Sequence, residues 1–366
     1  MNPLPVKIRV VFFNPWGRGL EQTADYLASL PTQAIAPFVS DPADAHLIGL
    51  ARLDRDWHAE CARCFDQMQS ATLDFLPSLI TGLEGLPALA SACAKRPPGE
   101  TWWFVLMGQH PQKFAPALSP LCTFLKKNGA RILYYAFDEA SRTMPCFADL
   151  APHLDVLIHD EAPLAHQNRL SPAARTLHRS WVANFPSFSV PFNDTPEAKI
   201  IFLGSQMGLT PHRQRQIDFL RTIFKDRFIA SHDHSVSVSD RASLNRYKVG
   251  FCPEGRKFTT PAMARTHTDR PFWSGCLGLV PVSENSHEGG RLDELADADL
   301  IVRYPHADLG ALRDACERAL AVSTEDRRRI HDHFNRHETV GGIVAEAIAH
   351  HAADGLSSLR RSSMAR

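Results

Sequence analysis

Three consecutive stretches of the sequence determine the fold class: WWFVLM at 102–107, APALSPLCTFLKKN at 115–128 and RILYYAF at 131–137. The first and third are near-continuous apolar runs, as in strands whose two faces are both buried. The middle stretch predicts a helix that ends at Asn128-Gly129, a common C-terminal stop. A strand, a helix and a second strand in this order predict one unit of a parallel sheet covered by helices.

The same alternation extends along most of the chain. Strands are predicted at 8–13 and 156–159, before a stretch at 163–196 that is rich in proline, asparagine and serine. A second series follows, with strands at 199–203, 247–252, 277–282 and 300–304 and helices at 214–224, 308–321 and 324–336. We therefore predict an α/β fold with two Rossmann-like parallel-sheet domains that face a central cleft. The expected domains are 1–190 and 191–352, followed by a flexible tail at 353–366, and a helix near 340–351 can pack on either domain.

Composition narrows the classes of function. The 366 residues include 40 Lys and Arg and 40 Asp and Glu, a balance that argues against a nucleic-acid-binding protein. The eight cysteines are scattered, and the lone pair Cys61 and Cys64 has no further ligands at zinc spacing. No signal peptide or apolar stretch of membrane-spanning length is predicted, so we expect a cytoplasmic protein. Arg360, Arg361 and Arg366 would support only a weak peripheral contact with a membrane.

Three loops of the second predicted domain follow strands and carry groups that bind phosphate. Backbone N–H groups at a helix N-terminus and nearby arginines both bind phosphate oxygens. Candidate residues in these loops are Gly204, Arg213, Arg215, Glu254, Arg256, Lys257, Arg270, Ser274 and Gly275. The alternative interpretation is that the glycines are ordinary turn residues and the arginines are solvated.

Part of this region resembles a known family. The segments YKVGFCPEG (247–255) and TDRPFWSGCLGLVPV (268–282) are similar to the donor half of GT-B glycosyltransferases, particularly exostosin-like and related bacterial types. The strand at 199–204 with the later Arg213, and the closing FNRHET at 334–339, resemble other motifs of that half. The sequence departs from the family pattern in two ways. Extra residues within Gly278-Leu279-Val280 separate Gly275-Cys276-Leu277 from Pro281-Val282, and the carboxylate that many GT-B enzymes have before the glycine turn is missing.

The resemblance implies a glycosyltransferase that takes a UDP-sugar or GDP-sugar as donor, without a metal or another cofactor. The diphosphate would be bound by the loop residues named above, and Glu284 and Asn285 would hydrogen-bond ribose or sugar hydroxyls. Arginine, lysine and helix N-terminal amides would then stabilise the leaving diphosphate. A polar loop without a ligand is the alternative for Glu284 and Asn285.

An inverting reaction needs a general base in the first domain, within reach of the acceptor hydroxyl. Asp138 and Glu139 follow a predicted strand and are the first candidates, then His110 and then Asp160. A retaining reaction would need no such base. Gly17, Arg18 and Gly19 could line the acceptor side, where the acceptor is a glycan, a lipid-linked sugar or a protein.

Four other short motifs predict no function. Asp54–Asp56 and Asp297–Asp299 match the DxD pattern, but the first lies in an unpatterned charged stretch and the second between a predicted helix and strand, as expected for chance matches. His232–His234 and His331–His333 could bind a metal, but neither has further ligands nearby in the sequence. Two other functions remain open. One is a nucleotide-sugar epimerase or hydrolase on the same fold, and the other is a non-catalytic module that binds a glycan or a nucleotide sugar.

Overall fold

The computed structural model describes residues 6–13, 73–76, 95, 98–108, 122–123, 125–136, 151–159, 175–178, 190–203, 210–231, 243–254, 270–285, 291–339 and 341–351. The chain divides into two compact units: residues 1–178 with 340–366, and residues 179–339. The helix at 341–351 therefore belongs to the first unit, whereas the sequence-based boundaries grouped it with the second. Among the described helices, none combines the length and apolar character needed to cross a membrane.

The first unit contains a parallel sheet with the strand order β2-β1-β3-β4-β5-β6. Its strands are β1 (Val6–Phe13), β2 (Leu73–Leu76), β3 (Glu100–Gly108), β4 (Arg131–Ala136), β5 (Val156–His159) and β6 (Arg175–His178), with a 3-10 helix (Ala151–His153) before β5. The central strands are buried at Trp102–Val105 and Ile132–Tyr135, which explains why they are apolar throughout. The sequence patterns did not predict β2 or β6.

The buried carboxylate of Asp155 connects the beginnings of β4 and β5. It accepts hydrogen bonds from the Lys126 ammonium, from the Arg131 guanidinium at 2.8 Å and from the Ile132 amide at 2.8 Å. Because each carboxylate oxygen has a donor, its burial costs little. This position therefore has a clear structural role.

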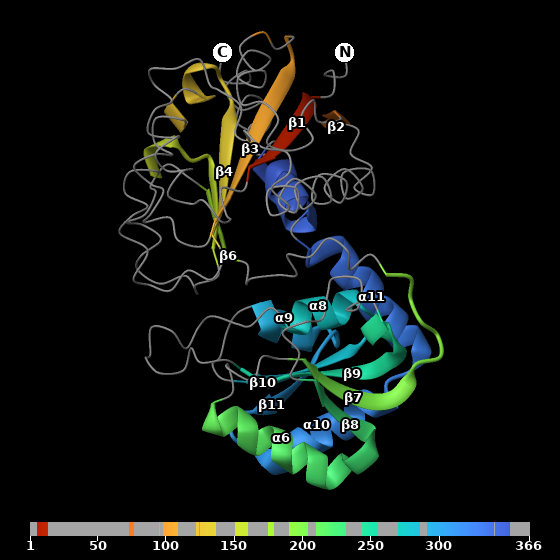
Figure 1. Cartoon of the computed structure of the whole chain (residues 1–366). Helices are drawn as coiled ribbons and strands as arrows, with labels where there is room; N and C mark the ends of the chain where they lie inside the picture. Colours follow the sequence, from red (N-terminus) through yellow and green to blue (C-terminus); the bar gives the residue numbers. More distant parts are fainter. Residues whose placement is uncertain are drawn as a thin grey trace, which may run out of the picture. The chain divides into compact units, whose positions relative to one another are not determined.

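The second unit contains a parallel sheet with the strand order β11-β10-β9-β7-β8. Its strands are β7 (Glu197–Leu203), β8 (Phe228–Ser231), β9 (Tyr247–Cys252), β10 (Val280–Asn285) and β11 (Val302–Pro305). The described helices are α6 (Pro211–Phe224), α8 (Arg270–Cys276), α9 (Arg291–Asp297), α10 (Leu309–Ala321) and α11 (Thr324–His337), with 3-10 turns at Lys225–Arg227 and Ser243–Arg246. Helices α6 and α10 cover one face of the sheet, and α8, with α11 packed on it, covers the other (Figure 1).

Local signals explain where these helices begin. Thr210, Asp308 and Ser323 each cap a helix, since their side-chain oxygens accept a hydrogen bond from the backbone of the first turn. Pro211 occupies the first position of α6, where no backbone donor is needed. Both sheets are parallel, and helices cover both faces of the second one, which confirms the predicted α/β class.

Candidate functional site

The strand order of the second unit identifies where a ligand would bind. The first strand of this sheet, β7, lies between β8 and β9, so the chain leaves β7 in one direction and later continues in the other. In doubly wound sheets, ligands bind beyond the carboxyl ends of the strands at this switch point. The segments that follow β7 and β9 contribute Arg213 and Glu254.

Arg213 connects the two sides of the switch point. Its side chain is buried, and its Nη2 and Nε donate to the main-chain carbonyl of Glu254 at 2.8 and 3.3 Å. Burial and the neighbouring positive charge of Arg270 lower the pKa of Arg213 to about 10, and the carboxylates of Glu254 and Glu284 partly offset this. A buried cation in this position favours the arrival of an anion.

Arg270 and Arg215 differ in their surroundings. Arg270 is the first residue of α8, with its guanidinium carbon 5.8 Å from the centre of the Phe202 ring at the end of β7. Arg215 lies in α6 on an exposed position. The structure therefore brings Arg213 and Arg270 together at the switch point, whereas Arg215 faces solvent two residues further along α6.

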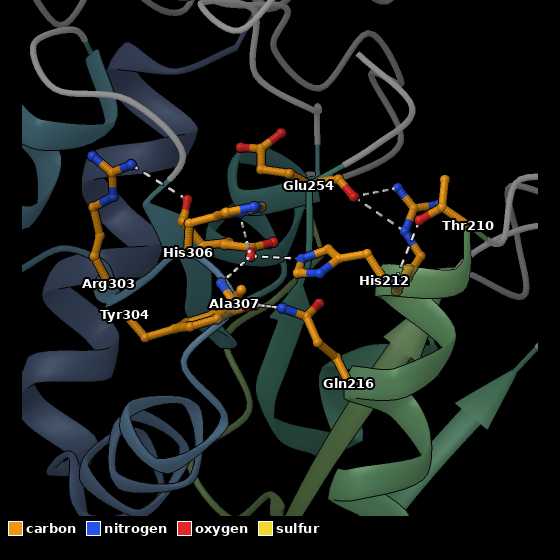
Figure 2. A network of polar contacts seen from close by, with 10 residues as sticks. Thr210, His212, Gln216, Glu254, Arg303, Tyr304, His306 and Ala307 are labelled. Carbon is orange, nitrogen blue, oxygen red and sulfur yellow. Dashed lines mark hydrogen bonds and ion pairs between the residues drawn. The ribbon is translucent and has the colours of Figure 1, made fainter. Parts of the chain in front are cut away.

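A second group of polar residues lies beside Arg213 and is centred on Glu284. Glu284 is fully buried, and its Oε1 accepts contacts from His212 Nε2 at 2.7 Å, His306 Nδ1 at 2.8 Å and the Ala307 amide at 3.1 Å. Its Oε2 is buried and has no hydrogen-bond partner among the described residues. Figure 2 shows the two imidazoles lying side by side, with their ring centres 4.7 Å apart.

Three different elements deliver these side chains. His212 is in the first turn of α6, Glu284 is in β10, and His306 directly follows β11. Below them, Gln216 donates to the hydroxyl of the buried Tyr304 at 3.2 Å (Figure 2), and burial raises the pKa of that hydroxyl. Sequence analysis did not select His306, although its place after a strand was the same signal that selected the other loops.

Glu284 and Asn285 are the last two residues of β10, not loop residues. The strand was predicted to end at Val282, but the turn after α8 occupies 277–279 and moves the strand three residues along the chain. The side-chain Oδ1 of Asn285 is buried without a hydrogen-bond partner among the described residues. Both positions thus offer a buried acceptor at the end of the strand.

Ser274 and Gly275 are buried within α8 and have packing neighbours. A Cβ atom at Gly250 would lie 2.5 Å from Ser274 Oγ, and one at Gly275 would lie 2.4 Å from Phe334 Cγ. The glycine that ends the helix is Gly278, with φ of 78°, and the Gly278 and Leu279 amides close the turn onto Gly275 and Ser274. Phosphate binding by Ser274 or Gly275 stays a prediction.

The remaining predicted site residues lie outside the described part of the chain. These are Asp138, Glu139, His110, Asp160, Gly17, Arg18, Gly19, Gly204, Arg256 and Lys257. The pairs Cys61 and Cys64, Asp54 and Asp56, and His232 and His234 also lie outside it. Within the described residues, His212, Glu284 and His306 form the one group of three side chains close enough to bind a single metal ion.

No protein-family model matches the chain, and no curated protein matches it. Several solved structures are similar over most of its length. AviGT4, a glycosyltransferase involved in avilamycin A biosynthesis, is 11% identical, with 96% of this chain and 98% of that chain covered and a TM-score of 0.42. The spinosyn rhamnosyltransferase SpnG with spinosyn aglycone is 11% identical over 89% and 88%, with a TM-score of 0.35. UGT2 of Phytolacca americana, complexed with UDP-2-fluoro-glucose and pterostilbene, is 10% identical over 96% and 99%, with a TM-score of 0.35.

Proposed function

We propose that this protein is a glycosyltransferase that moves a sugar from a nucleoside-diphosphate sugar to a hydroxyl group of a glycan, a lipid-linked sugar or a protein. The observation that carries the proposal is the buried Arg213 at the switch point of the second sheet, with Arg270 close enough to lower its pKa. Arg270 lies within the motif at 268–282, and Arg213 donates to the carbonyl of Glu254 in the motif at 247–255; both motifs resemble the donor half of GT-B enzymes.

The proposed chemistry follows from the charge that develops on the leaving group. When the bond between the sugar and the diphosphate breaks, negative charge accumulates on the β-phosphate, and fixed cations lower the energy of that state. We assign this role to Arg213 and Arg270, with Arg256 and Lys257 as further candidates, so that neither Mg²⁺ nor Mn²⁺ is required at the diphosphate. Transition-state stabilisation by fixed dipoles and charges needs no reorganisation during the reaction.

In this proposal, residues at the end of β10 bind the ribose and the sugar of the donor. The unpartnered Oε2 of Glu284 and Oδ1 of Asn285 are acceptors that ribose or sugar hydroxyls can satisfy. Each hydroxyl can donate one hydrogen bond, and a buried acceptor without a donor is costly.

For an inverting reaction, Asp138 remains the preferred general base, followed by Glu139 and His110. The donor would come from the cytoplasmic pool of nucleotide sugars.

A thermal-shift panel of UDP, GDP, CMP and dTDP, with and without added Mg²⁺, tests the donor assignment without knowledge of the acceptor. A ligand that binds only the folded state raises the melting temperature by mass action. We expect one diphosphate to raise it, equally with and without Mg²⁺. If no nucleotide changes the melting temperature, a glycan-binding module becomes the better interpretation.

A second experiment separates transfer from other reactions of the same donor. The protein is incubated with the matching nucleotide sugar, and the products are analysed for free sugar, an altered sugar nucleotide or a glycosylated acceptor. Asp138→Asn is expected to abolish transfer while nucleotide binding is kept. Release of free sugar or conversion to a stereoisomer, with no acceptor modified, would replace the transferase by a hydrolase or an epimerase.

A further inference from the structure

We propose that His212, Glu284 and His306 form a binding site for a divalent transition-metal ion, with Zn²⁺ as the expected ion. Each residue offers one ligand atom, and the three atoms lie within 4.8 Å of one another. Two imidazole nitrogens and one carboxylate oxygen are a ligand set used by zinc in proteins. The proposal concerns a different ligand from the sugar donor and does not depend on glycosyl transfer, although it uses Oε1 of Glu284, whose Oε2 is assigned to the donor above.

The burial of Glu284 is the main physical argument. Its side chain is fully buried, and within the described chain its ion-pair contacts are to His212 and His306. Among the described residues, the side-chain hydrogen bonds of Arg213 go to the carbonyl of Glu254, and its charge also acts on Glu284 without an ion-pair contact. A buried carboxylate needs a paired charge or a metal, and a divalent cation is a stronger partner for it than the ring N–H groups of two partly exposed imidazoles. A bound dication would supply the missing positive charge.

The geometry requires a small adjustment. Ligand atoms around a tetrahedral zinc ion with bonds of 2.0–2.1 Å are about 3.3 Å apart. The two nitrogens now lie 2.7 and 2.8 Å from Glu284 Oε1 and within 4.8 Å of each other. Each ring would move back from the carboxylate by roughly half an ångström, and the two nitrogens would also have to settle at about 3.3 Å from each other. The side chains of His212 and His306 are 31% and 48% exposed, so solvent lies beside both rings and such a shift needs no change in the core.

Proton positions must change as well. A ring nitrogen that donates a hydrogen bond to Glu284 carries a proton, whereas a metal ligand needs a lone pair at that atom. Each neutral imidazole can meet this requirement by moving its proton to the other ring nitrogen. The Ala307 amide donates to Glu284 Oε1 at 3.1 Å and would keep the carboxylate oriented when the ion is bound.

The ligand set also predicts which ions bind. Imidazole favours zinc, copper, nickel and ferrous iron, whereas magnesium and calcium prefer all-oxygen sites. We therefore expect Zn²⁺ to bind and Mg²⁺ in large excess not to displace it. An ion held here would connect α6, β10 and the segment after β11 at the edge of the sheet where Arg213 lies.

The test is direct measurement of zinc on the full chain, with no histidine tag. Protein stripped with a chelator and desalted is titrated with Zn²⁺, and bound metal is counted by elemental analysis. Co²⁺ serves as a spectroscopic probe of nitrogen ligation. We expect one ion per chain in the wild type and at least tenfold weaker binding in His306→Gln and His212→Gln. A zinc-dependent rise in melting temperature should be lost in the same variants.

His350→Gln is the matched control, because His350 is an exposed histidine 3.8 Å from a single carboxylate, that of Glu346. It should bind zinc like the wild type. His306 is half exposed, so its variant is expected to fold, and the melting temperature without metal checks this. The proposal is overturned if the wild type binds no zinc, or if His306→Gln and His212→Gln bind it as tightly as His350→Gln does. The metal count is independent of nucleotide binding, so either proposal can fail alone.

Discussion

The backbone of Gly275 lies directly against the ring of Phe334, because a Cβ atom at residue 275 would be only 2.4 Å from Cγ of that ring. This close approach joins α8 to α11, and Phe272 packs against the same ring at a centroid distance of 6.3 Å. Gly275, which the sequence placed in a candidate phosphate-binding loop, therefore has a packing role inside a helix.

Gly275→Ala should destabilise the second unit. Overpacking a tight core contact costs about 1–3 kcal/mol, and the fully buried Phe334 ring has no room to withdraw. Chemical denaturation of wild type and variant measures the difference. Gly310→Ala in α10 is the control, since its added Cβ would lie 3.4 Å from Oδ1 of Asp308, the residue that caps the helix. A wild-type free energy of unfolding for Gly275→Ala would contradict the packing argument.

Arg213→Ala should weaken nucleoside-diphosphate binding far more than Arg215→Ala. A hydrogen bond to a charged group contributes about 1.5–3 kcal/mol, equivalent to roughly a tenfold to hundredfold loss of affinity. Arg215 faces solvent on the same helix turn and should change affinity less than about threefold.

Calorimetric titration of the diphosphate, and of the matching nucleoside as a ligand without phosphate, gives both affinities. Arg213→Ala should leave nucleoside binding nearly unchanged. Equal losses for Arg213→Ala and Arg215→Ala would show that the buried arginine does not recognise the phosphates.

Arg327→Ala should be one of the most destabilising substitutions in the second unit. The buried Arg327 donates to the carbonyl of Gly278 at 2.8 Å and to that of Asn193 at 3.2 Å, and its guanidinium lies over the ring of Phe192. Removing it leaves the buried Gly278 carbonyl without its donor, at a cost of about 1–3 kcal/mol, and the partly buried Asn193 carbonyl also loses its donor.

Arg328→Ala provides the comparison for this substitution. Arg328 is the next residue, lies over the same Phe192 ring and pairs with Asp194, but it is exposed. An exposed ion pair contributes about 0–1 kcal/mol. Thermal and chemical unfolding of both variants should separate them clearly, and equal effects would mean that burial at residue 327 contributes little.

The Cys122 thiol should resist alkylation while the protein is folded. Burial raises its pKa from 9.0 to about 12, with a smaller opposing effect of Lys126, and the reactive species is the thiolate. The folded state thus disfavours ionisation. Its contribution to stability is complete below about pH 9 and is lost as the pH rises toward 12.

Mass-spectrometric mapping after iodoacetamide treatment at pH 8 measures this directly. Cys122 should remain unmodified in native protein and react in denaturant. The buried Cys252, Cys276 and Cys316 serve as internal comparisons, since they are shielded in the same way. Rapid native modification of Cys122 would contradict its burial.

Strands with continuous apolar runs were predicted well. The expected strands at 156–159 and 247–252 match β5 and β9 residue for residue. The strands β2, β6 and β8 were missed, and their length of four residues is not the reason, since β5 is equally short. Asp74 in β2 and Thr176 in β6 interrupt the apolar pattern, whereas β5 begins with three apolar residues in a row. The sequence places the start of β10 three residues too early, because Gly275 looks like the glycine that ends the preceding helix. In the structure the glycine that ends this helix is Gly278.

The candidate site was predictable in part. Arg213, Arg270 and Glu284 were predicted because they follow strands of one sheet, and in the structure the charges of Arg270 and Glu284 both act on Arg213. His306 could not be paired with His212 from sequence, since 94 residues separate them and only the sheet order brings β11 and α6 together. Burial likewise distinguished Arg213 from Arg215, which the sequence treated alike.

The helix at 341–351 has a consequence for the order of folding during synthesis. It belongs with residues 1–178, its Val344 and Ile348 are buried, and His351 meets the Trp103 ring edge-on at 5.1 Å. Domains generally fold as units while the chain emerges. The stretch 179–339 is therefore complete before the earlier-made unit receives its last helix, and a chain interrupted after residue 339 contains one finished unit and one unfinished unit.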